Sequence, residues 1–401
     1  MSPLLFNIYI DDLAVQLAKT SKVSHIPAAL FFADDVQLLP RNRYHAIEMI
    51  SIVEKWSLIN GMSANVNKCG IVTSDIVYPL SINNKLINVV PEYKYLGLPT
   101  TCNGINWHKY TSDIAHKAIN NLNYLRFIGS KFHPLVRLSL YKTFIKPILE
   151  YAAPLVYVSC KEKPSLKKCY IKPLQKVQSR ALGWISYSSN HTATIYTRLL
   201  QSICGLEGIE DRFKSLLIRF GLHFENLCPT NPAKILAESH HFDDKISLLG
   251  SNVHNHSSYT EAISNYKPCD KDDLTSSITK KKKYLNRKLN KIKYANIIKT
   301  KTINDRIKEI LPVSRHPENF TDISIRLKNP LDAKKAIRYR IGSLCPARKC
   351  PVCKNKFRHT HIQRCLKLSN TEQLFTNATT NKLIIRLNLI IAKVKKLHDP
   401  P

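Results

Sequence analysis

The sequence is poor in glycine and contains no long hydrophobic run. Glycine accounts for only 11 of the 401 residues, which favours helices over β-sandwiches. No run of about 18 apolar residues occurs, so we expect no membrane span. The N-terminus shows no basic region followed by a small-residue cleavage site, so we expect no signal peptide. Apolar residues still make up 44% of the chain, which is enough for the cores of two or three units.

Acidic residues are also scarce. The chain has 61 Lys and Arg against 29 Asp and Glu, which gives a formal net charge of +32. Such a surplus calls for a polyanionic partner, and we expect nucleic acid rather than an anionic membrane surface. The 11 cysteines are odd in number and mostly isolated, which excludes a disulfide scaffold. We therefore expect a reduced, intracellular protein that works in the nucleus.

A pair of neighbouring carboxylates stands between two apolar runs in segment 30–39, and Pro40 closes the second run. This pattern predicts a strand, a tight turn and a second strand, with Asp34 and Asp35 at the hairpin tip. Mg²⁺ binds one or two carboxylates and completes its shell with water and substrate phosphate. Two such ions about 3.5–4 Å apart can activate a 3′-hydroxyl and stabilise the leaving oxygen. An ordinary Asp-containing turn is the alternative.

Periodic segments surround this hairpin. Ser2 as N-cap and Pro3 at the first position predict a helix. We assign no catalytic role to its two mid-helix carboxylates, Asp11 and Asp12. A second helix with Gly61 as C-cap follows the hairpin, and short strands are expected at 70–73, 87–90 and 93–98. The apolar stripes of the two helices are Phe6, Tyr9, Ile10, Leu13 and Leu17 in the first, and Ala46, Met49, Ile50, Val53 and Trp56 in the second.

Four segments, in this order, resemble the boxes of reverse transcriptases. Segment 2–9 resembles the helix that follows the Gly-rich nucleotide-binding turn. Segment 32–35 is similar to the metal-binding box, with Phe in the place where many members carry Tyr. Segment 61–69 is similar to the next box, and 93–97 to the hairpin that the family calls its primer grip. The subtype that fits is the non-LTR (LINE-type) retrotransposon reverse transcriptase.

This resemblance implies RNA-directed DNA polymerisation, with Mg²⁺ as cofactor and with an RNA template and a DNA primer or target as partners. It implies that Asp34 and Asp35 are the Mg²⁺ ligands. It also implies that Lys68 is a proton donor or a charge that faces the incoming triphosphate, although a solvated surface lysine is the alternative. The residues implied in nucleotide or primer contact are Ser2, Pro3, Phe32, Tyr93, Lys94, Tyr95, Leu96 and Gly97.

One part of the family pattern is absent. The family uses a third carboxylate from a box upstream of the helix at Ser2, and this sequence contains neither that box, nor the fingers, nor the Gly-rich turn. We therefore expect that this chain does not polymerise DNA by itself. The alternatives are a retroelement remnant that only binds nucleic acid and a decayed reading frame without a function.

From residue 107 to 154 the pattern is helical. Gly129 ends one helix, Pro134 starts the next, and Pro147 is expected to kink it. Basic residues interleave with the apolar ones, which fits either a thumb that grips the template–primer backbone or a solvated face. These basic residues are Lys131, Arg137, Lys142 and Lys146.

Segment 280–299 is rich in lysine and carries a weak apolar stripe that includes Leu285 and Leu289. It predicts a basic amphipathic helix, for which phosphate contact, nuclear import and a solvated linker are the three interpretations. The residues that we predict to contact nucleic acid are Lys142, Lys146, Lys281, Lys282, Lys283, Arg287, Arg348 and Lys349.

The last chemical feature is a Cys/His cluster. Cys350, Cys353, His361 and Cys365 have the spacing C-x₂-C-x₇-H-x₃-C, and His359 is a rival for the third position. Four such ligands can form a closed tetrahedral Zn²⁺ site, so we expect one zinc ion. LINE-type elements often carry a Cys-Cys-His-Cys knuckle behind the thumb. A reduced Cys pair in a basic loop is the alternative.

The predicted fold class is α+β. We expect a partial reverse-transcriptase palm, built from a short antiparallel sheet with helices, and then a mostly α-helical thumb and connector and a small zinc-knuckle-like segment. The expected boundaries are 1–104 for the palm, 105–160 for the thumb, 161–235 for the connector, 236–300 for a polar linker and basic helix, and 301–401 for a basic C-terminal region with its knuckle at 350–365.

Overall fold

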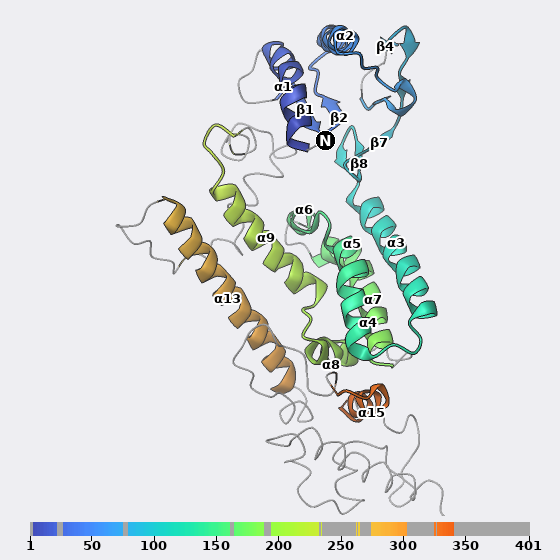
Figure 1. The fold of residues 1–401 in the computed structure, drawn as a ribbon, viewed down its shortest axis with the longest axis vertical. Helices are drawn as coiled ribbons and strands as arrows, with labels where there is room; N and C mark the ends of the chain where they lie inside the picture. Colours follow the sequence, from blue (N-terminus) through green and yellow to red (C-terminus); the bar gives the residue numbers. More distant parts are fainter. Residues whose placement is uncertain are drawn as a thin grey trace, which may run out of the picture. The chain divides into compact units, whose positions relative to one another are not determined.

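The residues that the computed structural model describes are 3–21, 27–74, 79–160, 164–187, 194–231, 274–302 and 327–340, together with residues 234, 262, 264 and 325. They form a mixed α/β structure that is mostly helical, with small sheets (Figure 1). They fall into two compact units, one within Met1–Tyr110 and Gly221–His256 and the other within Thr111–Phe220 and Ser257–Pro401. None of the helices among these residues is long and apolar enough to cross a membrane.

The first unit begins with two helices that pack on a β-hairpin. Helices α1 (Pro3–Lys19) and α2 (Arg43–Ile59) contact each other, and α1 also contacts β1 (Ala29–Phe32), which pairs with β2 (Asp35–Leu38) (Figure 1). The expected apolar stripes face this contact. The buried residues of this core are Ile10, Leu13, Leu17, Ala28, Met49 and Trp56.

Local side-chain and backbone contacts close helix α2 at both ends, and the sequence analysis predicts the second of them. The Asn42 side chain accepts a hydrogen bond from the His45 backbone N–H at 2.9 Å and so caps the first turn. The helix ends at Ile59, and Gly61 follows with φ +64°. Glycine adopts this left-handed conformation without a Cβ penalty, so the predicted glycine stop is confirmed.

Short strands complete the first unit. Strand β3 (Gly70–Ile71) pairs in parallel with β6 (Asn88–Val89). Strands β4 (Ser81–Ile82) and β5 (Lys85–Leu86) form a small antiparallel hairpin that the sequence analysis does not anticipate.

The prediction of a single strand at 93–98 is wrong. The segment forms two strands, β7 (Glu92–Tyr95) and β8 (Leu98–Thr101), and β8 also pairs with β9 (Gly104–Ile105). Leu96 and Gly97 have φ of +47° and +81°. Two positive φ values in a two-residue loop are typical of a type I′ turn, whose twist matches that of the flanking strands. The hairpin that the resemblance implies is therefore present, and Gly97 lies in its turn.

The second unit is helical. Within it α4 packs against α7, α8 against α7, α13 against α8, and α15 against α4 (Figure 1). Helix α15 falls in a region for which the sequence analysis predicts no helix. The bounds are α3 Trp107–Ile128, α4 Pro134–Leu140, α5 Lys146–Glu150, α6 Ala153–Ser159, α7 Pro164–Ile185, α8 Thr194–Cys204, α9 Ile209–Glu225, α13 Leu274–Thr302 and α15 Pro330–Arg340.

Helices α4 and α5 form one rod that a π-helical turn, Tyr141–Ile145, interrupts. The turn lies directly before Pro147, which has no N–H and whose ring would collide with the carbonyl four residues earlier. A local π-turn is one of the known causes of a kink. The predicted irregularity is thus confirmed, and so is the buried face of this rod. Its members are Leu138, Tyr141, Ile145 and Leu149.

Candidate metal and nucleic-acid site

The paired carboxylates lie at the tip of the β1–β2 hairpin, as predicted. Phe32 pairs with Asp35 across the last rung, and Ala33 and Asp34 form the two-residue turn. Ala33 has φ +51°, a left-handed conformation that costs a residue with a Cβ about 1 kcal/mol. Such strained residues cluster at functional sites. The turn leaves Asp34 and Asp35 exposed.

Two exposed neighbouring carboxylates suit Mg²⁺, because that ion keeps several waters and takes only one or two protein carboxylates in addition to substrate phosphate. Within the described part of the chain, no group of three or more His, Cys, Asp or Glu side chains gathers as a metal site. Asp34 and Asp35 therefore fit the expected ion as a partial ligand set.

Tyr93 joins the Lys68 segment to the β7–β8 hairpin. Its hydroxyl donates a hydrogen bond to the Lys68 carbonyl at 2.5 Å. Its ring lies so close to Gly70 that a Cβ there would come 2.8 Å from the ring carbon Cδ2. The side chain of Lys68 stays exposed. Tyr93, which the resemblance places in primer contact, thus holds the backbone beneath Lys68.

Asp35 lies within electrostatic reach of this hairpin. Burial raises the pKa of Tyr93 and that of Tyr95 above the usual value for a phenol, and the negative charge of Asp35 adds to the shift of both. The charge of Cys69 also contributes at Tyr93. Tyr93 therefore contacts the Lys68 segment directly and lies within electrostatic reach of Asp35, although these residues lie far apart in the sequence.

These segments share one family match. Residues 1–100 match the family model described as reverse transcriptase (RNA-dependent DNA polymerase). Over these residues the chain is similar to the reverse transcriptase family. Members of this family bind a nucleic-acid template and primer and generally use Mg²⁺. Searches of curated proteins and of solved structures found no match to the chain.

The reverse transcriptase segment contains every residue implied in catalysis and in nucleotide or primer contact. Lys94 is exposed on β7, and Phe32 is exposed at the end of β1. Pro3 is the first residue of α1, and Ser2 lies outside the described residues. Leu96 and Gly97 form the β7–β8 turn.

Asp12, to which we assign no role from the sequence, has a structural one in this segment. Its Oδ1 accepts a hydrogen bond from the Trp56 indole Nε1 at 2.7 Å and another from the Leu13 backbone N–H at 2.8 Å. It therefore fixes α1 to α2 on one side of the core. Asp12 directly precedes Leu13 of the apolar stripe, and this position at the edge of the stripe is a sequence signal for the contact.

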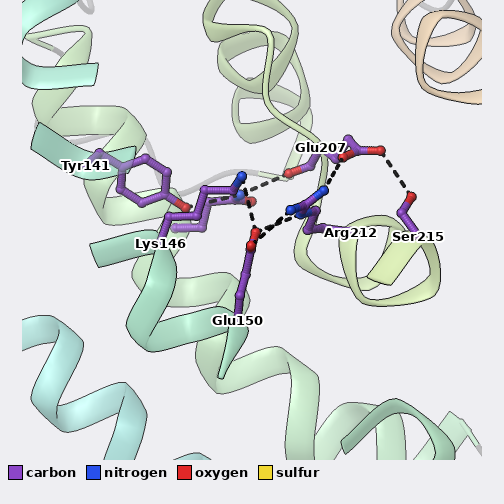
Figure 2. A network of polar contacts seen from close by, with 7 residues as sticks. Tyr141, Lys146, Glu150, Glu207, Arg212 and Ser215 are labelled. Carbon is purple, nitrogen blue, oxygen red and sulfur yellow. Dashed lines mark hydrogen bonds and ion pairs between the residues drawn. The ribbon is translucent and has the colours of Figure 1, made fainter. Parts of the chain in front are cut away.

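Outside the reverse transcriptase segment, the two thumb cations predicted to contact nucleic acid differ in their surroundings. Lys142 is exposed. Lys146 is only 29% exposed, and its Nζ lies 3.4 Å from Oε1 of Glu150 (Figure 2). Burial lowers the pKa of Lys146, and the neighbouring Arg212 charge lowers it further. Lys146 thus points into a cluster of the protein's own polar side chains.

This polar cluster, Lys146–Glu150–Glu207–Arg212–Ser215, links α5 to α9 (Figure 2). Arg212 donates from Nε and Nη2 to the two oxygens of Glu150, at 2.8 and 3.1 Å. Burial lowers the Arg212 pKa, but the hydrogen bonds and the charge of Glu150, with the charge of Glu207, outweigh burial and raise it overall. The fork geometry of this pair makes it the strongest contact of the cluster.

Arg137, grouped from the sequence with the exposed cations of the thumb, is buried at 3% exposure. It donates from Nη1 to the Trp184 carbonyl and from Nη2 to the Ser130 carbonyl, each at 2.5 Å. Its guanidinium carbon lies 3.8 Å from the centre of the Tyr187 ring. A planar guanidinium stacks well on an aromatic face, which explains why this cation lies inside the helical unit.

The remaining predicted contacts lie on α13 or beyond the described residues. Lys282, Lys283 and Arg287 are exposed on α13, and Lys281 is half-buried. The residues that lie outside the described residues are Arg348, Lys349, Cys350, Cys353, His359, His361 and Cys365. The zinc site therefore stays a prediction.

Proposed function

We propose that residues 1–104 are the second half of the palm of a non-LTR (LINE-type) reverse transcriptase, which synthesises DNA on an RNA template during target-primed retrotransposition. The observation that carries this proposal is the convergence of Asp35, the Lys68 segment and strand β7 within the segment that matches the reverse transcriptase model. The order of the four boxes supports the LINE-type subtype.

In this proposal Asp34 and Asp35 hold Mg²⁺, and Asp34 is the more important of the two. When bound, the ions activate the primer 3′-hydroxyl and stabilise the leaving oxygen. The exposed Lys68 ammonium faces the incoming triphosphate, and Tyr93 is a positioning residue because it fixes the Lys68 carbonyl. Hydrogen bonds that set the orientation of a charged group contribute to catalysis by preorganisation.

The catalytic centre needs a third carboxylate, and we propose that it comes from polypeptide that is not part of residues 1–401. Large apolar side chains of this segment support this idea, since Leu5 and Ile8 on α1 and Phe32 at the hairpin are more than half exposed. Exposed apolar side chains of this size mark surfaces that bind another element. By itself, this chain is then expected not to polymerise.

Primer extension on an RNA template with a DNA primer tests both parts of the proposal. The sequence upstream of the Met1 codon is read first, because an open frame with a Gly-rich turn and an Asp-bearing strand defines the longer polypeptide to compare. We expect the longer polypeptide to synthesise DNA. Asp34→Asn is expected to lower the rate of synthesis at least 100-fold. The control Asp11→Asn removes an exposed carboxylate from α1 and is expected to leave the rate unchanged.

Two outcomes contradict the proposal. Synthesis by residues 1–401 alone that depends on Asp34 shows that no further carboxylate is needed. Full synthesis by the longer polypeptide with Asp34→Asn shows that the hairpin is not the metal site.

The alternative is a retroelement remnant that only binds nucleic acid. The net charge of +32 and the exposed Lys142, Lys282 and Arg287 favour it. A stop codon directly upstream of Met1, together with binding that does not depend on Asp34, selects this alternative. Under either proposal the protein works in the nucleus. Each chain is expected to bind one zinc ion, which the Cys353→Ser variant loses, and elemental analysis measures the zinc content.

A further inference from the structure

Helix α13 (Leu274–Thr302) carries charge of one sign only. Its 29 residues include ten Lys and Arg and no Asp or Glu. Charge of this density usually belongs to disordered tails, so the folded state of this segment requires a stabilising contact elsewhere.

That contact lies on one face of the helix. Leu285 and Leu289 are 2% and 6% exposed, and α13 packs against α8. Lys288 also turns inward: its Nζ donates to the Ala262 carbonyl at 2.9 Å and lies 5.9 Å from the centre of the Tyr284 ring. The part of the apolar face that carries Leu285 and Leu289 is thus covered by the protein itself, whereas Ile292 is 44% exposed.

The opposite face carries an evenly spaced row of cations. Lys283, Arg287 and Lys291 are exposed and follow one another at four-residue intervals, which places them about 6 Å apart along the helix axis. At 100° per residue, this row stands opposite Leu285 and Leu289.

Within the described residues, no carboxylate neutralises the charges of this row. No ion pair joins Lys283, Arg287 or Lys291 to a carboxylate in the part of the chain that the structure describes. Like charges at i,i+4 destabilise a helix by about 0.2–0.5 kcal/mol for each pair. An external polyanion relieves this repulsion.

We propose that the row Lys283–Arg287–Lys291 binds the phosphate backbone of an RNA strand, independently of its base sequence. A membrane surface fits less well, because a membrane-bound helix inserts its apolar face, and α13 buries Leu285 and Leu289 of that face against the protein. The choice of RNA rests on the proposed function, since the first 100 residues match an RNA-dependent polymerase.

The test measures RNA binding by the full chain. Fluorescence anisotropy of a single-stranded RNA of mixed sequence gives the binding constant at several salt concentrations. EDTA is present, so no step of this assay depends on the Mg²⁺ site. The row variant is Lys283→Gln/Arg287→Gln/Lys291→Gln. The control is Lys168→Gln/Lys172→Gln/Lys176→Gln, which removes the same charge from three exposed positions of α7 that also follow one another at four-residue intervals.

We expect the row variant to flatten the slope of log K against log salt by about 2, because each lost phosphate contact reduces it by about 0.7 for a single strand. The control variant is expected to flatten it by less than half as much. Circular dichroism shows whether both variants keep their helix content, and Gln retains a high helix propensity.

Three results overturn the proposal. An equal reduction of the salt slope in the two variants shows that total charge determines binding and that the position of the row does not. Unchanged binding in the row variant shows that α13 does not contact the strand. Stronger row-dependent binding to DNA of the same sequence, or to vesicles with anionic lipid, assigns the surface to a different partner.

Discussion

The reverse transcriptase segment and the helical unit differ in whether their apolar and charged side chains are buried or exposed. In the helical unit, Leu149 is fully buried, and Arg212 meets its carboxylate inside the structure. In the reverse transcriptase segment, Ile8 is 64% exposed, and Asp34 and Asp35 project from a turn. The helical unit satisfies Leu149 and Arg212 with its own side chains. The reverse transcriptase segment presents groups that a ligand or another polypeptide can satisfy.

The largest expected effect compares apolar truncations in the two regions. Leu149→Ala is expected to lower the free energy of unfolding by about 2–5 kcal/mol, because it opens a cavity in a closed core. Ile8→Ala is expected to stay within about 0.5 kcal/mol, because an exposed side chain loses little on truncation. Urea denaturation measures both values. A loss above about 2 kcal/mol for Ile8→Ala means that something covers α1, and the contrast between the regions then fails.

The next effect concerns the internal charges. Glu150→Gln removes the carboxylate between Lys146 and Arg212, and we expect a loss of about 3 kcal/mol, since two partly buried cations then lack their shared anion. Glu210→Gln is the matched control, because it breaks the more exposed pair with Lys167 and is expected to cost less than about 1 kcal/mol. Equal losses in the two urea titrations indicate that the polar cluster contributes no more than a surface ion pair.

The smallest effect is a pH dependence. The pKa of Lys146 is lowered from 10.5, mainly by burial, so the folded chain binds fewer protons at this site than the unfolded chain. Stability therefore rises as the pH rises through the lowered pKa towards 10.5, and the unfavourable charge persists at lower pH. Lys146→Met is expected to remove this rise, and Lys142→Met, at an exposed position, is expected to keep it. An identical alkaline profile in wild type and Lys146→Met refutes the assignment.

Local patterns predict much of this fold. The apolar stripes of α1, α2 and α4, the Asp-containing hairpin and the stop at Gly61 all follow from spacing within a few residues of each other. The β4–β5 hairpin has such a signal too, because Asn83 and Asn84 occupy its turn with φ of +49° and +59°, and Asn tolerates these values. That dipeptide could have identified it.

The contacts that the sequence analysis misses join distant segments. Asp12 and Trp56 are 44 residues apart, and Glu150 and Arg212 are 62 residues apart. The burial of Arg137 depends on Tyr187, which follows it by 50 positions. Neither propensity nor periodicity contains such pairings, because tertiary packing decides which charged residue finds a partner. At the candidate site, the boxes predict which residues take part, and only the structure shows that Tyr93 turns towards Lys68.

The even spacing on α13 has a consequence for movement. Lys283, Arg287 and Lys291 repeat at one interval, so a strand that shifts along its own axis meets nearly the same charges again. Electrostatic contacts of this kind let proteins slide along a nucleic acid, because no single register is strongly preferred. The electrostatic energy of a template that advances by one nucleotide at each step would then change little, so α13 would keep the strand bound without fixing its position.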